Sequence, residues 1–577
     1  MDRRLVTRLV GSAALGLVAI GVAWIVVTGL LARSQLNQAK AELRQLRSAL
    51  SSGDAANARS IAHDLSAHAQ RAHALTTGPA WWVTANVPAL GAPLETARTI
   101  AAQTDLVTSR VLPGVIRLSD TVTSTSLRGA SRINLAPIND SEATLSTAAA
   151  SATDALAQVS AAPSGTWLPA ANSARSSVLT SLTGLRDDLT GAQRAVRTLL
   201  PMLGQSTLQR YFVGFENEAE ARGLGGLPGA FAILTVDHGR FAFTHFGNDP
   251  ELSKVSADLD LGADFNTRYG QDAPTETYIN SNVSPDFSDA ARIWAAMWEK
   301  KSGQHVDAAI AVDPVALSYL LKATGAASLS DGSQVSAANV VALTQKAQYS
   351  RFSIDSARNA FLNDIAQTVA KKLTSGGGNT VALVRAATKA VGERRIAVWS
   401  ADPTIQANIV AAGYGAVLQS SNASTGFVVV NAAGSKLDYY LERTMSYRRS
   451  SCAAGTAIAT FTLTNDAPRS GLPAYVTVRV DHPPAAARPG DNRLLVTYYA
   501  SHGADITSVK VDGRRTGVTP LPEKGLVTAT IDVEVPAQAS RTITVTVREP
   551  VRDGPLQVLR QPLVRPMKVD LDAPNCN

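Results

Sequence analysis

The stretch FENEAEARGLGGLPG, Phe215 to Gly229, holds three glutamates, one arginine and four glycines between two apolar runs. An arginine guanidinium binds anions through a planar set of donors, and glycine lets backbone N–H groups come close to a ligand. The stretch is therefore interpreted either as a ligand-handling loop or as a tight structural turn. In the second alternative Glu220 and Arg222 pair with each other or with neighbouring residues, Asn217 caps the turn, and the glycines adopt positive φ.

The elements that must position this stretch are strands, predicted from short apolar runs at 211–215 and 230–236. Asp237-His238-Gly239 marks a turn before an alternating run at 240–246, which predicts a hairpin with Gly239 in the left-handed conformation. The charged stretch would thus join two strands at a sheet edge. Helical patterns follow at 286–301, 314–324, 337–345 and 356–373, with Asp313-Pro314 capping the second helix. Strands mixed with helices predict a central α/β domain over residues 203–433.

The N-terminal region predicts a membrane anchor. Leu9 to Leu31 carries no charge and is long enough to cross a bilayer as a helix, after a short tail, residues 1–8, that contains three arginines. The exit from this segment is a poor cleavage site, so an uncleaved anchor is expected. Residues 1–8 would be cytoplasmic and the bulk of the chain extracytoplasmic, although basic residues beyond Leu31 blunt the charge signal for orientation.

Residues 32–202 predict a helical membrane-proximal region, with a helix from Ser34 to Ala74 in a run that lacks proline. Gly78-Pro79 ends that pattern, and Trp81-Trp82 follows. The tryptophan pair is interpreted either as a membrane-interface contact or as a packed corner.

Beyond Gly434 the texture changes to short alternating strands at 457–465, 474–481, 493–501, 526–535 and 541–547, separated by Pro, Gly and Asp. Regular spacing of this kind predicts an antiparallel β-sandwich over residues 434–577. The only two cysteines, Cys452 and Cys576, lie near the two ends of this region. One disulfide between them is expected in an oxidising compartment, and two unpaired thiols are the alternative.

Composition and missing motifs exclude several classes of function. A chain of 577 residues with 45% hydrophobic residues predicts two to four folded domains, in a multidomain α+β arrangement. The net charge of +7 is spread along the chain without a dense basic run, which argues against nucleic-acid binding. The sequence contains no P-loop, no GxSxG elbow and no HExxH motif.

Several motifs in a fixed order resemble the bacterial family of domain of unknown function 4012. Its N-x-x-E-x-R-x-x-G-G-x-x-G pattern is matched by Asn217, Glu220, Arg222, Gly225, Gly226 and Gly229. The segments AVDPVALSYLLKATG (311–325), GSKLDYYLER (434–443) and LTNDAP (463–468) resemble later blocks, as do Asn339, Tyr349, Arg358 and Phe361. The resemblance spans roughly residues 81–547 and implies a membrane-anchored envelope protein without an assigned reaction.

The order of elements is also similar to that of LytR-CpsA-Psr enzymes, which move glycopolymers from a polyprenyl pyrophosphate lipid onto the cell wall. This resemblance implies a LytR-CpsA-Psr-like central domain in which Arg222, Arg351 and Arg358 bind pyrophosphate and Gly225 and Gly226 supply backbone N–H groups. A divalent metal such as Mg²⁺ would take Glu220 or Asp355, and apolar helix faces at 340–343 and 361–369 would hold a lipid tail. The chain departs from that family where Gly-Leu-Gly follows Arg222 in place of an Asp, which puts catalysis in doubt.

The expected function is that of an anchored, extracytoplasmic envelope protein that binds a lipid-linked or polymeric glycan during surface polysaccharide assembly. The expected ligand-binding residues are Asn217, Glu220, Arg222, Gly225, Gly226, Arg351, Asp355 and Arg358. Two alternatives stay open: an active glycopolymer phosphotransferase that uses a polyprenyl-pyrophosphate-linked substrate, and a non-enzymatic scaffold for partner proteins. Ligand binding predicts that the three arginines converge on one groove, whereas a scaffold predicts that they are scattered and paired with carboxylates.

Overall fold

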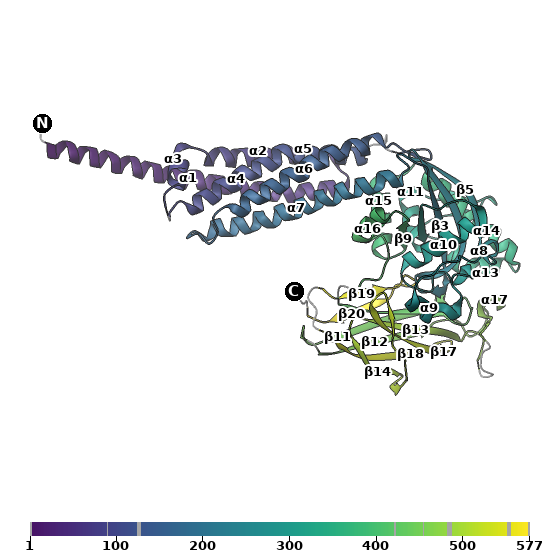
Figure 1. Ribbon diagram of the computed structural model, residues 1–577. Helices are drawn as coiled ribbons and strands as arrows, with labels where there is room; N and C mark the ends of the chain where they lie inside the picture. The colour runs from purple at the N-terminus through teal and green to yellow at the C-terminus, as the bar shows by residue number, and fades with distance from the viewer. Residues whose placement is uncertain are drawn as a thin grey trace. The chain divides into compact units, whose positions relative to one another are not determined.

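The computed structural model describes residues 3–88, 90–123, 128–420, 423–453, 455–481, 487–550 and 555–574. The chain divides into two compact units (Figure 1). The first, here called the helical unit, comprises Met1–Leu127 and Asn134–Pro201. The second, here called the sheet unit, comprises Arg128–Ile133 and Met202–Asn577. The architecture is mixed α and β, as the sequence predicts at this coarse level.

The helical unit is a set of long helices packed through alanine and leucine. Its helices are α1 (Arg3–Ser52), α2 (Ala55–Thr76), α3 (Pro79–Ala85), α4 (Ala92–Arg110), α5 (Leu112–Thr123), α6 (Ala136–Ala161) and α7 (Pro169–Met202). Ala39 and Leu46 of α1 pack against Ala58 and Leu65 of α2 in one buried cluster. Small alanine side chains bury one face of each helix against its neighbours, which is the amphipathic arrangement of a packed helix.

The predicted helix at 34–74 is interrupted. Gly53 adopts φ 72° and ends α1, and the Asp54 side chain then accepts a hydrogen bond from the Asn57 backbone N–H at the start of α2. Glycine followed by a side-chain cap is a sufficient local signal for this break.

The helix α1 also contains the candidate membrane span. Among the described residues, the segment Ala19–Leu50 is the one helix segment that is long and apolar enough to cross a membrane. The predicted span at 9–31 lies within α1 and overlaps the start of this segment. The N-terminal part of α1 projects from the bundle in Figure 1.

The sheet unit begins with a seven-stranded sheet of order β1-β2-β5-β4-β3-β6-β9. Its strands are β1 (Arg128–Gly129), β2 (Arg132–Ile133), β3 (Gln209–Arg222), β4 (Gly225–Asp237), β5 (Arg240–Asn248), β6 (Ala308–Val312) and β9 (Ile396–Ser400). The strand β3 pairs antiparallel with β4 and parallel with β6. The predicted turn between β4 and β5 is confirmed, since His238 and Gly239 both adopt positive φ, as a two-residue hairpin turn requires.

Helices cover this sheet and fix its central strands. They are α8 (Asp249–Leu252), α9 (Ala263–Tyr269), α10 (Phe287–Ser302), α11 (Pro314–Thr324), α12 (Val340–Ala342), α13 (Gln348–Arg351), α14 (Asp355–Thr374), α15 (Thr380–Gly392) and α16 (Pro403–Ala411), and a small two-stranded sheet joins β7 (Ala327–Ser328) to β8 (Gln334–Val335). The ring of Trp294 of α10 packs on the ring of Phe212 of β3. The same tryptophan ring lies directly over Gly214, where a Cβ would be only 2.6 Å from it. Asp313 caps α11 by accepting from the Ala316 N–H, as its position before Pro314 predicts.

The C-terminal part of the sheet unit contains two further sheets. The five-stranded sheet has β16 (Leu521–Glu523), β17 (Leu526–Val535), β13 (Asn492–Ala500), β10 (Ser424–Asn431) and β19 (Gln557–Arg560) in that order. The six-stranded sheet has β15 (Arg514–Arg515), β14 (Asp505–Val511), β18 (Ala539–Glu549), β12 (Gly455–Asn465), β11 (Leu441–Arg449) and β20 (Lys568–Asp572). One buried hydrophobic cluster holds residues of both, and the rings of Phe427 and Phe461 stack with centroids 4.5 Å apart.

Two local expectations for this part were incomplete or wrong. Each C-terminal sheet contains one parallel pair, β10 with β19 and β11 with β20, so the pairing is not wholly antiparallel. The predicted strand at 474–481 begins instead with a short helix, α17 (Ala474–Thr477), because Pro473 precedes it and Tyr475 packs against Tyr349 of the central helices. Cys576 lies outside the described residues, so its pairing with Cys452 stays a prediction.

Candidate functional site

The sequence predicts that the charged stretch at 215–229 is a loop at a sheet edge, and this prediction is wrong. The stretch forms the ends of β3 and β4, which lie in the middle of the seven-stranded sheet and are joined by the short turn Gly223-Leu224. The pairing of the two strands is irregular between Asn217 and Ala221, where β3 bulges. The displaced backbone is held by side chains from elsewhere: the Ala219 N–H donates to Gln345 at 2.8 Å and the Ala221 N–H to Asp438 at 2.7 Å.

The glycines of this stretch are needed for space, not for positive φ. Neither Gly225 nor Gly226 has a positive φ, so the prediction that these glycines adopt the left-handed conformation is wrong. A Cβ on Gly226 would lie 2.3 Å from the carbonyl carbon of Asn217, and one on Gly225 would lie 2.8 Å from a Glu216 carboxylate oxygen. Both glycines are buried, so the backbone here is packed against protein and does not form an open cradle for phosphate.

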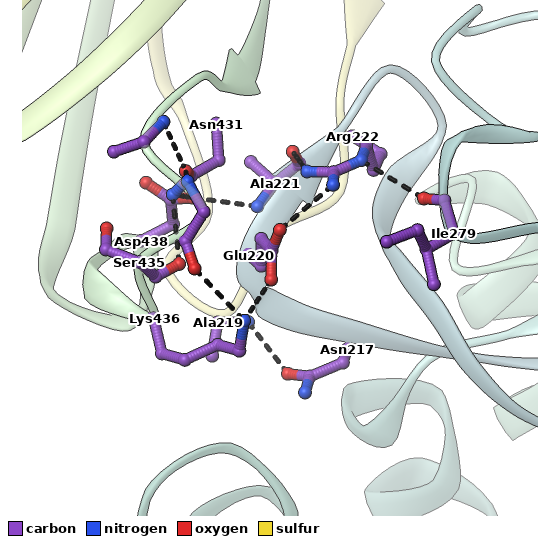
Figure 2. A network of polar contacts seen from close by, with 12 residues as sticks. Asn217, Ala219, Glu220, Ala221, Arg222, Ile279, Asn431, Ser435, Lys436 and Asp438 are labelled. Atoms are coloured by element: carbon purple, nitrogen blue, oxygen red, sulfur yellow. Dashed lines mark hydrogen bonds and ion pairs between the residues drawn. The ribbon is translucent and has the colours of Figure 1, made fainter. Parts of the chain in front are cut away.

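Arg222 is buried in an ion-pair network, which Figure 2 shows. Its guanidinium donates to Glu220 at 2.9 Å and to the Ile279 carbonyl at 3.2 Å, and the second oxygen of Glu220 accepts from Lys436. Burial opposes ionisation of Glu220, but the charges of Arg222 and Lys436 outweigh it and lower the pKa of this carboxyl. The predicted alternative of an internal Glu220–Arg222 pair is therefore the arrangement that the structure contains.

A second buried acid cluster lies next to this network and was not found from sequence. Arg395 donates to Glu218 at 3.1 Å and to Asp313 at 2.8 Å, and both carboxylates are fully buried. Burial is also the main reason that the pKa of Glu216 is raised to about 8, and it raises the pKa of Glu218 well above its ordinary value. No motif in the sequence links Arg395 to Glu218 and Asp313, because Arg395 lies far from both in the chain.

Together these contacts tie the central sheet to the C-terminal sheets. Lys436 reaches Glu220, Gln561 donates to the Arg222 carbonyl at 2.6 Å, and Arg395 donates to the Leu563 carbonyl at 2.9 Å. The charged stretch is thus first of all a junction within the sheet unit.

A polar pocket of about 280 Å³ opens beside this junction. Its charged lining residues are Glu220, Asp249, Arg358 and Lys436. Burial raises the pKa of Asp249 to about 6, so its charge changes near neutral pH. The volume lies just below the range of ligand pockets, which begins at about 300 Å³.

Aromatic side chains form one wall of the pocket. Tyr349 and Tyr475 stack with centroids 5.7 Å apart, and Asn217 donates to the Tyr349 hydroxyl at 2.8 Å. The Arg358 guanidinium lies over the Tyr475 ring at 3.7 Å from its centroid, and Tyr475 is still 40% exposed. The Tyr475 ring therefore offers a face beside a cation, an arrangement suited to a planar or ring-shaped ligand.

Three asparagines of the pocket have amide groups left for a ligand. Within the described ranges, no protein group forms a hydrogen bond with the side chain of Asn248, Asn359 or Asn363, and all three line the pocket. The Asn363 carbonyl oxygen is moreover buried. A buried polar atom without a partner costs free energy, so a ligand that donates to it would be favoured.

A smaller apolar cavity of about 60 Å³ adjoins the polar pocket. The two share Asn217, Gly229, Ala230 and Leu362 among their lining residues. Ile365 and Ala366 of α14 also line the apolar cavity, and they belong to the helix face at 361–369 that was predicted to hold a lipid tail.

The structure places the predicted site residues in different surroundings. Asn217, Glu220 and Arg358 line the polar pocket, whereas Arg222, Gly225, Gly226, Arg351 and Asp355 do not. Arg351 pairs with Asp331 at 2.7 Å on the surface, and Asp355 is exposed and pairs with Arg358. The three arginines are therefore paired with three separate carboxylates and do not converge on one groove. This is the arrangement expected for a scaffold, and the expected groove that ends at the three arginines is wrong.

The predicted metal ligands do not fit a divalent cation. Both oxygens of Glu220 are engaged by Arg222 and Lys436, and Asp355 lies outside the pocket lining. Over the part of the chain that the structure describes, no group of three or more His, Cys, Asp or Glu side chains is arranged to hold a metal ion.

Replacing Arg222 should destabilise the fold far more than replacing Arg351. Arg222→Ala leaves Glu220 buried with a lost partner, so we expect a loss of about 3–5 kcal/mol in the free energy of unfolding. Arg351→Ala removes an exposed ion pair and should cost about 0–1 kcal/mol. Urea unfolding of the full-length protein in detergent, followed by circular dichroism, measures both; equal losses would contradict the structural role of Arg222.

Stability should also depend on pH through Glu216. Since its pKa rises from 4.5 to about 8 on folding, the folded state binds more protons than the unfolded state between these pH values. Stability therefore falls as the pH rises through this window, and Glu216→Gln should make the fall smaller. Urea midpoints at pH 5 and pH 8 test this, with the exposed Glu276→Gln as control; an unchanged pH dependence in Glu216→Gln would refute the assignment.

Comparison with known proteins gives one match. Neither a curated protein nor a solved structure matches the chain significantly. Residues 208–349 match the family model described as protein of unknown function, DUF4012. This range contains β3, β4, the buried charges at 216–222 and Tyr349, whereas Arg358, Lys436 and Tyr475 of the pocket lie beyond it. Residues 208–349 of this chain therefore belong to the DUF4012 family.

Proposed function

We propose that this is a membrane-anchored envelope protein, with its bulk extracytoplasmic, whose polar pocket binds a lipid-linked or polymeric glycan during surface polysaccharide assembly. The observation that carries the proposal is the pocket of about 280 Å³, lined by asparagine amides that form no hydrogen bond with any described residue and by the half-exposed ring of Tyr475. Sugars present many hydroxyl groups and an apolar ring face, which amides and an aromatic ring satisfy together.

The charges of the pocket support binding of a hydroxyl-rich ligand more than binding of a bare pyrophosphate. Each cation already has a carboxylate partner: Lys436 pairs with Glu220, and Arg358 pairs with Asp355. Such paired groups still accept and donate hydrogen bonds at modest cost, but they offer little net positive charge to a pyrophosphate.

The adjoining apolar cavity supports a ligand that carries a lipid. Its lining by Leu317, Leu362 and Ile365 would accept a short apolar portion next to a sugar in the polar pocket. In this proposal the seven-stranded sheet with its helices is the LytR-CpsA-Psr-like domain, and the two C-terminal sheets form a β-sandwich.

Catalysis is the weaker proposal. A phosphotransferase needs cations or a metal aimed at the transferred phosphate, and Arg222, which the transferase resemblance places there, is buried against Glu220. We therefore propose a binding protein whose site is the polar pocket and not a groove of arginines. The paired arginines match a scaffold for partner proteins, which is the alternative that a failed binding experiment would favour.

Binding is tested with the full-length protein in lipid nanodiscs, by biolayer interferometry against a panel of bacterial surface oligosaccharides and a polyprenyl-phosphate-linked disaccharide. We expect at least one member to bind and the pair Asn359→Ala and Asn363→Ala to weaken it about ten-fold, since each lost hydrogen bond costs about 0.5–1.5 kcal/mol. Asn408→Ala, on α16 outside the pocket, is the matched control and should bind normally.

Two outcomes of this experiment would contradict the proposal. Binding that is equally weakened by Asn408→Ala would place the ligand elsewhere, and no binding by any panel member would favour the scaffold. If only the lipid-linked sugar binds, the apolar cavity is part of the site; if free oligosaccharides bind equally well, it is not.

The extracytoplasmic location is tested through the cysteines. Arg448 of β11 lies opposite Asp572 of β20, and Cys452 and Cys576 both follow soon after this pair, so we propose that they form a disulfide. In native membranes a maleimide polymer should add to no cysteine before reduction and to both after it. The single variant Cys452→Ser should add one label without reduction, and labelling of both wild-type cysteines without reduction would contradict an oxidising location.

A further inference from the structure

One end of the helical unit is unusually apolar. The exposed side chains of Trp82 and Val83 on α3, Leu90 before α4, and Trp167 and Leu168 between α6 and α7 are between 38% and 61% exposed. These segments meet, because the Trp167 indole N–H donates to the Leu90 carbonyl at 3.2 Å. Exposed aromatic and aliphatic groups gathered in this way mark an interaction surface.

Charge is missing from the same end of the unit. Residues 74–94 contain no Asp, Glu, Lys, Arg or His, and neither do residues 155–174. In a surface facing only water such stretches would be expected to carry charge, as the rest of this chain does with 18% charged residues. In Figure 1, α3 and the connection from α6 to α7 lie at the end of the bundle from which α1 projects.

This end also contacts α1 within the predicted membrane span. The Trp81 indole N–H donates to the Thr28 hydroxyl at 2.8 Å, and its ring lies 3.5 Å from where a Cβ on Gly29 would stand. Thr28 precedes the first charged residue after the span, Arg33, and a helix rises about 1.5 Å per residue. The contact therefore lies within about 8 Å of the charged end of the span, on its apolar side.

We propose that this end of the helical unit, formed by residues 79–88, 90–94 and 163–169, is immersed in the lipid bilayer at the level of the headgroups and upper acyl chains. It rests on the proposed anchorage by α1, and the leaflet is the one on the C-terminal side of the span. Trp82 and Trp167 are the interfacial aromatics, since tryptophan concentrates at this depth. The bilayer is the occupant because the Trp81–Thr28 contact joins this surface to α1, where the neighbouring side chains of Val27, Leu30 and Leu31 are apolar and exposed.

Nitroxide spin labels test this depth in the full-length protein in nanodiscs. Single labels are introduced by Val83→Cys and Leu168→Cys at the proposed surface, by Val22→Cys within the span, and by Ser60→Cys on the exposed side of α2. Accessibility to oxygen, which concentrates in lipid, is compared with accessibility to a water-soluble nickel complex. We expect the oxygen-to-nickel ratio at residues 22, 83 and 168 to exceed that at residue 60 several-fold.

The outcomes separate this inference from anchorage itself. If residue 22 is in lipid but residues 83 and 168 behave like residue 60, the inference is wrong and the anchor stands. If residue 22 also behaves like residue 60, the anchor fails as well. Protection of residues 83 and 168 from both reagents, with spin–spin broadening, would identify a second copy of the chain as the occupant and would overturn the bilayer assignment.

Discussion

The carboxylate of Glu220, held between Arg222 and Lys436, is the interaction on which the sheet unit depends. All three side chains are largely buried, and a charge in such a place persists only when its partners are close. The bulge in β3 is what makes this possible, because it shifts Glu220 out of the regular strand pairing. The bulge in turn is held by Gln345 and Asp438, both of which lie more than a hundred residues beyond it in the chain.

The same constraint shapes the polar pocket. Glu220 faces the pocket with its paired cation Lys436, and Asn217, at the start of the bulge, orients Tyr349 in its wall. Structural charges and ligand-facing amides therefore share a few residues of one strand. For this reason the stretch at 215–229 both connects the central sheet to the C-terminal sheets and lines the polar pocket.

Local patterns predicted the local elements well. The β4–β5 turn, the cap of α11 at Asp313, and the helices near 286–301 and 356–373 depend on neighbours within a few residues, so the sequence carries their signals. The strand expected at 474–481 was wrong because Tyr475 is held by Tyr349, a contact between residues far apart in sequence. The pocket was predicted only in part, because its residues come from distant parts of the chain. Asn217, Glu220 and Arg358 were identified by type, whereas Asn363 lay in no motif and Lys436 lay in the block 434–443 without any sign that it reaches Glu220.

From its order of residues alone, this chain specified an apolar N-terminal helix, a helical region, mixed helices and strands, and a family motif around Asn217, Glu220 and Arg222, because periodicity and short motifs are local properties. Folding in three dimensions decided which charges meet. The sequence allowed Arg222 to bind either a ligand or a neighbouring side chain. In the fold Arg222 pairs with Glu220, because a buried guanidinium is stable only when a carboxylate lies close to it.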